Sequence, residues 1–458
     1  MNQNLLLGAK DRPKTSKLVL LSIQHVFAMF GATVLVPILT GLSISVALFC
    51  SGIGTLIYIL CTKAKVPIYL GSSFAYISYV IGAANMTGGG YGAALTGIVI
   101  AGLIYCIVAI FIKISGTEWL NKLLPPVVVG PMIMVIGLGL SSSAILNTGL
   151  VEKATENLLS NPFAGDWRSI VVAIVTMLVI AFVAIKAKGF FKVIPFLIGI
   201  VFGYIFAIII GFIPNSDYGQ LVNLNSIKEV IIHPAQWFKI PDFKFIGWKN
   251  SELGLGIEMV KINFAAAISV IPLAFATICE HIGDHKVLGK ITGEDYLKDP
   301  GLHRTLLGDG IATSVAGLLG GPANTSYGEN TSVVGITKVG SVWVTGGAAI
   351  IAIALSFCNI FTTIISSIPS CVMGGICLIL YGFIASNGLK TLQDANTDLT
   401  KTRNLIIISV MLIIGIGGAV LSFGSFNFSG MALAAVFGII LNLILPNEES
   451  ESESSSLE

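Results

Sequence analysis

The sequence predicts an all-α polytopic membrane protein, with fourteen spans in a seven-plus-seven inverted repeat and short antiparallel strands in the third and tenth segments. Composition is the first indication, because the 458 residues are 54% hydrophobic and 11% charged, whereas a soluble domain carries about a quarter charged residues. Apolar runs of roughly 20 residues, enough to cross a hydrocarbon core of about 30 Å, recur along the chain. The third indication is that two pairs of related motifs occupy equivalent places in the two halves.

The apolar runs set the boundaries of the predicted spans. We place them at 17–39, 43–62, 67–83, 91–113, 125–146, 168–186, 191–213, 264–287, 304–320, 325–338, 341–364, 369–387, 403–422 and 427–446. The first repeat then covers 17–213 and the second 264–446, with a long outer loop at 214–263 between them. A polar segment, 1–16, precedes the first span, and the acidic stretch 447–458 is typical of a disordered tail.

The positions of lysine and arginine support the span count, because basic residues favour cytoplasmic loops. With the N-terminus inside, 19 of the 26 basic residues fall in inner segments. The other seven lie in or beside the two long outer loops, where the rule is weak. Without the third and tenth segments the alternation would fail after residue 63, so both polar segments are expected at membrane depth. We therefore expect a multi-pass protein of the cytoplasmic (inner) membrane with both termini cytoplasmic.

Composition and motifs disfavour several other classes of function. The net charge of +2 gives no support for nucleic-acid binding, which needs a basic face. The seven cysteines lie in or beside apolar runs without a C-x-x-C spacing, and we interpret them as small core residues. No G-x-S-x-G, H-E-x-x-H or Walker pattern indicates an enzyme. The N-terminal segment lacks an apolar core and cleavage site, so we expect no removable signal peptide.

Paired motifs indicate how the two halves are related. "LPPVVVGP" at 124–131 and "IPSCVMGG" at 368–375 share Pro, Val and Gly at equivalent positions. "PIYLGSSFAYI" from Pro67 and "PANTSYGENTS" from Pro322 each place a Pro and then small polar residues in the third segment of their half. Because seven spans is an odd number, the two halves must run in opposite directions. Inverted repeats with broken polar segments are typical of a secondary transporter with a binding site near the bilayer midplane.

The two polar segments predict short extended strands followed by half-helices. Non-helical backbone is tolerated at membrane depth only where it is buried in protein or lines a cavity, and half-helix N-termini bind polar ligand atoms. The alternative is that the Ser, Thr and Gly residues merely permit close helix packing. That alternative does not explain Glu329, which lies within the run "NTSYGEN".

Three carboxylates at membrane depth are the candidate binding residues. Glu280 lies inside the eighth predicted span, Asp284 follows at i+4 on the same helix face, and Glu329 lies in the tenth segment. Buried carboxylates are costly and usually mark a pathway or a site. We predict that they bind a neutral, hydrogen-bonding solute and that one of them carries a coupling proton.

The histidines and the remaining acidic residue leave other interpretations open. The carboxylates could instead pair with His281, His285 or Lys338 as buried struts, and Asp284 and His285 could already belong to the cytoplasmic interface. Two histidines at i, i+4 without a further ligand do not predict a metal site. Asp309, between two glycines, is interpreted as a helix-end or packing residue. Gln24 and His25 either support the site from behind or form a satisfied core pair.

An ordered set of motifs carries a resemblance to a known family. The motifs are "QHVFAMFGATVLVP" (24–37), "YLGSSFAYIS" (69–78), "CEHIGDH" (279–285), "GDG" (308–310) and "GGPANTSYGENTSVVGITKV" (320–339). In this combination the chain closely resembles the nucleobase-ascorbate transporter family, in its uracil permease branch, from residue 17 to about 446. The resemblance implies fourteen spans in an inverted repeat, a core domain and a gate domain each drawn from both repeats, and uptake of uracil by proton symport.

The resemblance also implies roles for individual residues. Glu280 and Glu329 would hydrogen-bond the pyrimidine ring, and the backbone amides at Phe74 and Gly328 would meet its oxygens, with Ser73 and Tyr327 beside them. Proton coupling would involve Glu280, Asp284 and His285, and Gln24, His25, Asn330 and Ser332 would support the site from behind. The implied partners are uracil, the proton and the lipid bilayer, with a homodimer left open; no cofactor, metal or nucleic acid is expected.

Two positions depart from the family pattern. Ser332 stands where the signature usually has Gly, and Asp284 stands where a uracil permease has a coupling His, with His285 one place further on. Glu329 before Asn330 is typical of pyrimidine carriers, since xanthine or urate carriers tend to have Gln there. The alternatives are a symporter for another nucleobase, such as xanthine, and an anion transporter of the same fold. An anion transporter predicts a basic residue in the tenth segment, where this chain has Glu329.

Overall fold

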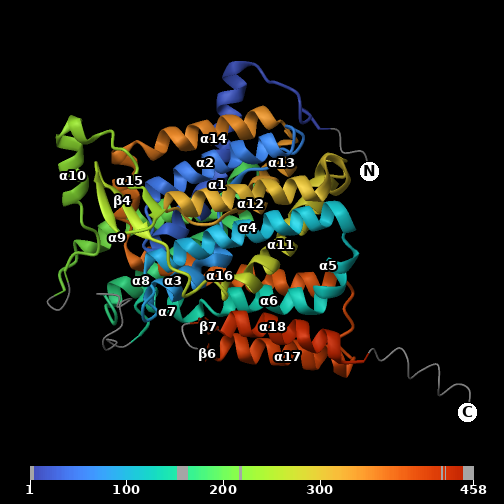
Figure 1. Cartoon of the computed structure of the whole chain (residues 1–458). Coiled ribbons are helices and arrows are strands. Elements are labelled where there is room, and N and C mark those ends of the chain that lie inside the picture. The colour runs from blue at the N-terminus through green and yellow to red at the C-terminus, as the bar shows by residue number, and fades with distance from the viewer. Residues whose placement is uncertain (1–4, 152–162, 216–218, 424–425, 429, 447–458) are drawn as a thin grey trace, which may run out of the picture.

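The computed structural model describes residues 5–151, 163–215, 219–423, 426–428 and 430–446. Its helices are α1 (Thr15–Thr40), α2 (Ile44–Cys61), α3 (Ile77–Asn85), α4 (Tyr91–Ser115), α5 (Glu118–Leu123), α6 (Pro126–Leu138), α7 (Ser141–Thr148), α8 (Trp167–Lys186), α9 (Pro195–Gly211), α10 (Asn225–Ile232), α11 (Val270–Thr292), α12 (Leu302–Leu319), α13 (Gly328–Thr337), α14 (Val342–Ser356), α15 (Asn359–Ser366), α16 (Ser370–Asp394), α17 (Thr402–Ile416) and α18 (Gly430–Ile444). Its strands are β1 (Leu70–Ser72), β2 (Lys244–Gly247), β3 (Ser251–Gly254), β4 (Ile257–Lys261), β5 (Asn324–Ser326), β6 (Leu421–Phe423) and β7 (Phe426–Phe428). The protein is mostly helical, as the sequence predicts (Figure 1).

Every predicted span coincides with at least one helix. Among the described residues, six helices are long and apolar enough to cross a bilayer, and four apolar helices are shorter. The number of fourteen crossings stays a prediction. The predicted disordered tail at 447–458 lies outside the described residues.

Several predicted boundaries were wrong. The predicted spans 125–146 and 341–364 are each broken into two helices, α6 and α7 in the first and α14 and α15 in the second. Helix α16 continues to Asp394 instead of ending near 387. The reason is packing, because Leu392 and the Gly388 carbonyl lie against Gly130 of α6. Helix α11 begins and ends later than the predicted span 264–287, since Leu288 and Thr292 are still buried.

Equivalent helices of the two halves make equivalent contacts, which shows the inverted repeat. Helix α4 packs on α12 as α14 packs on α2, and α8 packs on α9 as α17 packs on α18. The closest approaches correspond as well. A side chain at Gly52 of α2 would meet the Ala349 carbonyl of α14 at 2.5 Å, and one at Gly310 of α12 would meet the Gly102 carbonyl of α4 at 2.7 Å. Small residues at these crossings let the backbones approach closely, as in other membrane helix pairs.

The helices form two bundles that Figure 1 shows one above the other. The first bundle contains α1, α2, α4, α11, α12 and α14, and the second contains α6 to α9 and α16 to α18. Strands β1 and β5 lie in the first bundle and pair antiparallel, with Gly71 opposite Thr325. A helical segment follows each strand, α3 after β1 and α13 after β5. The predicted strands and half-helices of the third and tenth segments are therefore confirmed.

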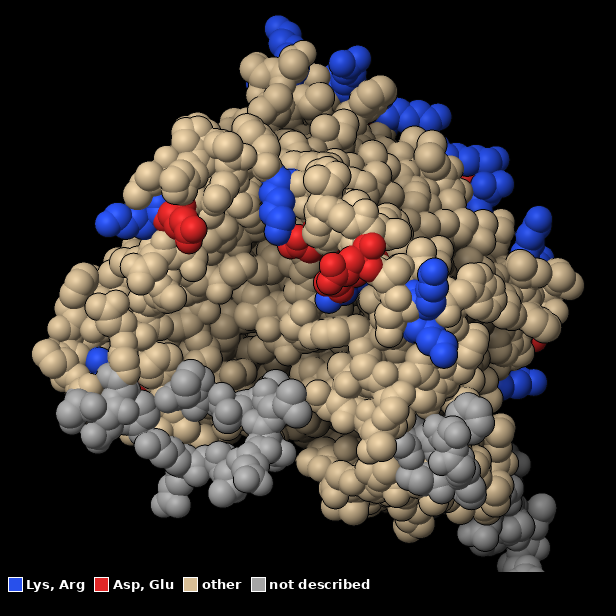
Figure 2. Space-filling view, turned by 60° about the vertical axis from the view of Figure 1, so that its left-hand side comes forward, with Lys and Arg blue, Asp and Glu red and all other residues tan. Residues whose placement is uncertain are grey.

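The segment between the repeats is more structured than the outer loop that the sequence predicts. It contains α10 and a three-stranded sheet with β4 in the centre, parallel to β2 and antiparallel to β3. Figure 2 turns this side of the molecule forward. Charged side chains lie mainly over the upper half of that face, and the surface is hollowed near the middle (Figure 2).

Candidate functional site

The antiparallel strands β1 and β5, called the crossed strands below, fix the start of α13. The N–H of Ser73 donates to the Ala323 carbonyl at 2.8 Å, and the N–H of Tyr327 donates to the Tyr69 carbonyl at 3.0 Å. The Tyr327 hydroxyl also donates to the Ser72 carbonyl at 2.7 Å. Position 71 must be glycine, because a Cβ there would lie 2.5 Å from the Tyr327 ring. This pairing sets Gly328 and Glu329 at the N-terminal end of α13, beside the segment that begins at Phe74.

The N-terminal end of α13 borders an accessible space. Gly328 is exposed and Glu329 is half-buried, although both follow a fully buried strand. The first N–H groups of a helix have no partner within it, and the helix dipole makes this end positive. It is therefore a place where a ligand carbonyl or a carboxylate can bind. Asp284 Oδ1 of α11 lies 3.5 Å from the position that a side chain at Gly328 would occupy.

Glu280 and Asp284 belong to the same space. They lie one turn apart on α11, with Glu280 exposed and Asp284 half-buried. Within the described part of the chain, no hydrogen bond or ion pair joins Glu280, Asp284 or Glu329 to another side chain. The interpretation of these carboxylates as struts paired with histidine is therefore wrong, and all three keep free acceptor oxygens.

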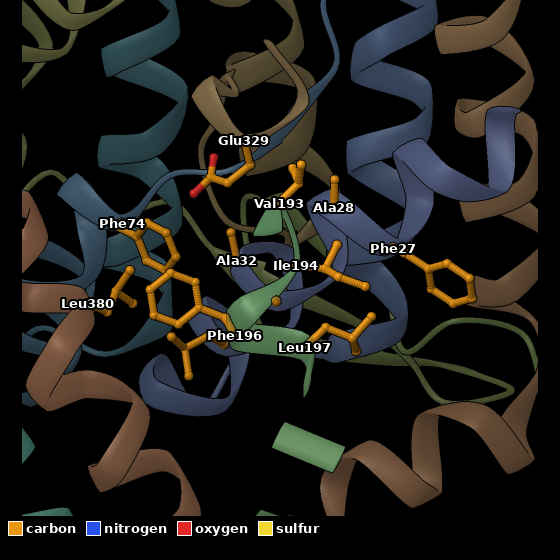
Figure 3. A pocket seen from close by; sticks show the side chains of 12 residues that line it. Phe27, Ala28, Ala32, Phe74, Val193, Ile194, Phe196, Leu197, Glu329 and Leu380 are labelled. Atoms are coloured by element: carbon orange, nitrogen blue, oxygen red, sulfur yellow. The ribbon is translucent and has the colours of Figure 1, made fainter. Parts of the chain in front are cut away.

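Glu329 also borders a small cavity of about 20 Å³. Its lining is otherwise apolar and comes from both bundles: Phe27, Ala28, Gly31, Ala32, Leu35, Phe74, Val193, Ile194, Phe196, Leu197 and Leu380. Figure 3 shows the Glu329 carboxylate at one end, with the rings of Phe74 and Phe196 next to each other on the side where Leu380 lies. The volume is close to that of a single water site. Binding of a larger molecule here requires the two bundles to separate.

The adjacent face of the same stretch of α11 carries histidines that are fully paired. His281 Nδ1 lies 2.8 Å from Asp309 Oδ2, and His281 Nε2 lies 2.9 Å from the Thr305 hydroxyl. Asp309 also accepts from the backbone N–H of Ser326 at 3.2 Å and from its hydroxyl at 2.9 Å. Asp309 is 0% exposed. It lies in the middle of α12 and holds β5, so the interpretation of Asp309 as a helix-end residue is corrected.

His285 continues this buried face one turn further along α11. Its Nε2 lies 2.5 Å from the Tyr58 hydroxyl and its Nδ1 lies 2.7 Å from the His281 carbonyl. His285 is 1% exposed. It therefore packs toward α2 and not into the space that contains Glu280. One signal of this network is visible in the sequence, an Asp between two glycines inside an apolar span, but nothing there connects it to Ser326.

Of the residues expected behind the site, Gln24 and His25 lie on α1 and Asn330 lies on α13, while Ser332 lies at the surface of α13. The side-chain amide of Asn330 donates to the His25 carbonyl at 3.1 Å and lies 3.1 Å from His25 Nδ1, which ties α13 to α1. Among the described residues, the buried oxygens Gln24 Oε1 and Asn330 Oδ1 have no hydrogen-bond partner. Ser332 is exposed, and its hydroxyl donates back to the Gly328 carbonyl at 3.1 Å. The described part of the chain holds no group of three His, Cys, Asp or Glu residues that could bind a metal ion.

Two solved structures have the same fold. The transmembrane domain of a cyanobacterial bicarbonate transporter, BicA, has a TM-score of 0.59, with 14% identity over 95% of this chain and 99% of that chain. The murine Slc26a9 anion transporter in its inward-facing state has a TM-score of 0.64, with 12% identity over 95% of this chain and 69% of that chain. These two likenesses show that the chain has the inverted-repeat fold of this class of membrane proteins.

The sequence comparisons give the family within this class. A model of a permease family matches residues 16–423. The chain belongs to this family, the nucleobase-ascorbate transporters. It is 47% identical to a uracil permease of Bacillus subtilis (strain 168) over 452 residues, which are 98% of this chain and 97% of that protein. It is 38% identical to a uracil permease of Escherichia coli (strain K12) over 438 residues, which are 96% of this chain and 93% of that protein.

Proposed function

We propose that the protein is a symporter that takes up uracil across the cytoplasmic membrane, driven by the proton gradient. The observation that carries the proposal is a pair of carboxylates, Glu280 and Glu329, beside the N-terminal end of α13, to which no other side chain is bonded within the described residues. Uracil presents two N–H donors and two carbonyl acceptors, so its site needs both acceptors and donors. The full-length similarity to uracil permeases supports the same substrate.

The roles of the site residues follow from their positions. Glu280 and Glu329 accept the ring N–H groups, and the backbone N–H groups of Phe74 and Gly328 donate to the ring oxygens. Ser73 and Tyr327, expected beside uracil, are each 4% exposed. Ser73 is bonded to Ala323, and Tyr327 is bonded to Tyr69, Ser72 and Thr33, so both residues hold the site and do not touch the ring.

The coupling proton binds on the carboxylate side of α11. Asp284 is half-buried, lies one turn from Glu280 and has a carboxylate oxygen near Gly328. His285, the other candidate, is bonded to Tyr58 on the buried side. We therefore assign the relay to Glu280 and Asp284, and give His285 a supporting role. Asp284 takes the place of the coupling histidine that the family pattern predicts.

Alternating access follows from the division into two bundles. The crossed strands and α11 belong to the first bundle, and the second bundle contributes Phe196 and Leu380 to the wall of the small cavity. In this proposal the first bundle is the core domain and the second is the gate domain. Movement of the core domain against the gate domain opens the site first to one side of the membrane and then to the other. Both termini are cytoplasmic in this proposal. If the protein forms a homodimer, each protomer holds its own site.

An anion transporter of the same fold is the main alternative in the choice of substrate. The structural similarity to a bicarbonate transporter and to an anion transporter concerns the fold alone. The residues that line the cavity next to Glu329 include no lysine or arginine. Carboxylates without a nearby cation repel an anion and accept hydrogen bonds from a neutral nucleobase. The site therefore favours a neutral substrate.

Uptake of labelled uracil into proteoliposomes tests the proposal. The purified protein is reconstituted, and uptake is measured with and without an inward proton gradient at constant sodium. We expect accumulation that follows the gradient and is chased out by unlabelled uracil. Uptake that ignores the proton gradient but follows another ion would overturn proton coupling alone. Absence of uracil binding would overturn the substrate.

The variant Glu329→Gln sharpens the choice between nucleobases. An amide in place of the carboxylate removes one acceptor and adds a donor, which suits a purine better than uracil. We expect the affinity for uracil to fall roughly 10-fold or more, the loss of one charge-assisted hydrogen bond, and xanthine to compete better than before. Competition of unlabelled xanthine against labelled uracil measures both effects. Unchanged uracil affinity would remove Glu329 from the site.

A further inference from the structure

The outer segment between the repeats contains an apolar arm that the transport site does not use. We define the outer arm as residues 225–240, which comprise α10 and the chain that follows it. Its exposed apolar side chains are Ile231, Ile232, Trp237, Phe238 and Ile240, with Phe238 77% exposed. Contiguous exposed apolar surface is unfavourable in water and marks an interaction site. We propose that the outer arm is inserted into the outer headgroup and acyl boundary of the bilayer, where these side chains contact lipid.

The arm is fixed to the break between α14 and α15. The N–H of Lys239 donates to the Phe357 carbonyl at 3.0 Å, and the N–H of Asn359 donates to the Trp237 carbonyl at 2.8 Å. The Asn359 side chain donates to the Gln236 carbonyl at 2.9 Å. These bonds satisfy backbone groups that the end of one helix and the start of the next leave free. Such pairing within the protein is what backbone at membrane depth requires.

The length of α14 sets the depth of this break. At its inner end, Arg12 stacks 5.0 Å above the ring of Trp343, which is 50% exposed, a pairing typical of a membrane interface. Helix α14 has 15 residues, a length of about 22 Å. The hydrocarbon core is about 30 Å thick. A helix that begins at the inner interface therefore ends before the outer interface, and Phe238, paired beside Phe357, lies at or below the outer boundary.

The arm also has the character of an interfacial segment. Helix α10 packs on α15 through the buried Val230, and the Trp237 ring N–H donates to the Ile231 carbonyl at 3.4 Å. Figure 1 shows α10 across the end of the long helices, with its axis roughly perpendicular to them. An amphipathic helix in the plane of the interface, with tryptophan beside it, is typical of membrane-surface binding.

The neighbouring sheet provides an internal contrast. Strand β2 covers the outer end of α12, where Lys244 lies 2.7 Å from the position of a side chain at Gly320. Helix α4, whose outer end lies under β4, has 25 residues, about 37 Å. Helix α12 has 18 residues, about 27 Å, so of these two helices only α4 is long enough to pass through the core, and β4 lies over its outer end. Trp248, in the turn between β2 and β3, is 87% exposed and lies in water.

Trp237 and Trp248 make the proposal testable with single substitutions. Because Trp119, Trp167 and Trp343 also emit, each is first replaced by Phe, and Trp237→Phe and Trp248→Phe are made in this background. The variants are reconstituted in liposomes of phosphatidylcholine with or without bromine near the top of the acyl chains, and iodide is the aqueous quencher. We expect Trp237→Phe to lose the larger part of the bromine-quenched emission and to shift the remaining emission to longer wavelength. Trp248→Phe should lose the larger part of the iodide-quenched emission and shift it to shorter wavelength.

Two other outcomes would overturn the proposal. If Trp237 accounts for iodide quenching as Trp248 does, the arm stands in water. If Trp237 emission is reached by neither quencher, a second copy of the chain or another part of the protein covers the arm. Size-exclusion elution and melting temperature show whether each variant is folded, independently of uracil transport.

A second pair of variants keeps the test independent of the tryptophan substitutions. Phe238 and Leu255 are 77% and 78% exposed, but Leu255 lies in the turn between β3 and β4. Phe238→Asp should move Trp237 toward water, with a shift of the emission to longer wavelength and less quenching by bromine. Leu255→Asp should change neither. Equal effects of the two substitutions would show that the arm has no special relation to lipid.

Discussion

Helix α11 presents two faces that differ in how their polar groups are satisfied. On one face, His281 and His285 are at most 2% exposed and bonded to Asp309, Thr305 and Tyr58. On the adjacent face, Glu280 and Asp284 are accessible, and no other described side chain is bonded to them. Glu280 and His281 are neighbours in sequence, yet Glu280 is exposed and His281 is buried in the protein core.

This difference separates groups that position the site from groups that can bind. Buried polar groups in native proteins are almost always hydrogen-bonded, and a satisfied network makes one arrangement rigid. The histidine face fixes β5 in one position, because Asp309 accepts hydrogen bonds from both the backbone N–H and the hydroxyl of Ser326. Accessible carboxylates without partners keep their acceptor oxygens for a ligand. Substitutions on the two faces should therefore change different measured quantities.

The largest effect is expected from the substitution Asp309→Ala on the histidine face. It leaves His281 and the Ser326 N–H buried without their shared acceptor. Leaving a buried hydrogen-bonding group without its partner costs about 1–3 kcal/mol for each group. We expect a large fall in melting temperature in detergent, measured by fluorescence-detected size exclusion. Asp394→Ala, at an exposed position near the end of α16, is the matched control and should melt as the unmodified protein does.

The next largest effect is expected from Glu280→Gln on the carboxylate face. The amide keeps the shape of the side chain but weakens the bond to a ring N–H of uracil. A hydrogen bond to a charged group contributes about 1.5–3 kcal/mol, so the affinity for uracil should fall roughly 10-fold to 100-fold. Stability should not fall, because no partner loses its bond. Calorimetric titration and melting curves measure the two quantities, with Glu252→Gln on the exposed sheet as the control.

If Glu280→Gln instead lowered the melting temperature as Asp309→Ala does, the distinction between the faces would fail. Glu280 would then be a structural residue whose partner lies elsewhere in the protein. Unchanged affinity together with unchanged stability would also remove Glu280 from the binding site.

The carboxylates of α11 and α13 could be identified from the sequence, because the cost of burying an acid in an apolar span does not depend on knowing its neighbours. An acid within an apolar span is expensive wherever the span packs, so Glu280 and Glu329 could be identified without knowing their neighbours. The two strands were predictable for a similar reason. Runs of Gly, Ser, Thr and Asn at membrane depth cannot face lipid as regular helix, and the basic residues on either side fixed that depth.

The histidine face could not be predicted, because its meaning depends on contacts between distant segments. His281 and Asp309 are 28 residues apart, and Ser326 lies 17 residues beyond Asp309. Periodicity places two histidines on one side of α11 but does not say that α12 and β5 pack there. The break at Phe357 was missed for the same reason, since the segment that satisfies its backbone, 236–239, belongs to the outer arm.

The substitution Asp284→Asn tests whether the carboxylate face has two functions. Asp284 lies one turn from Glu280 toward the C-terminal end of α11, and we expect it to carry the proton and not the nucleobase. The amide should slow proton-driven accumulation of uracil while changing its affinity by less than about threefold, below 1 kcal/mol. Uptake into proteoliposomes with and without a proton gradient, beside binding measured by calorimetry, separates the two. Normal gradient-driven accumulation in the variant would return Asp284 to a structural role.

The smallest effect is expected from Tyr58→Phe, the mildest change on the histidine face. The substitution removes the hydroxyl that lies 2.5 Å from His285 Nε2 but leaves the ring in the core of α2. Loss of one hydrogen bond costs about 1 kcal/mol, so the melting temperature should fall slightly. Uracil affinity should stay within error, because the carboxylates and the start of α13 do not contact Tyr58.

Tyr91→Phe, whose hydroxyl donates to the Gly41 carbonyl at 3.1 Å, is the control. A tenfold loss of affinity in Tyr58→Phe alone would mean that His285 acts on the carboxylate face through α11, and that the two faces work as one unit.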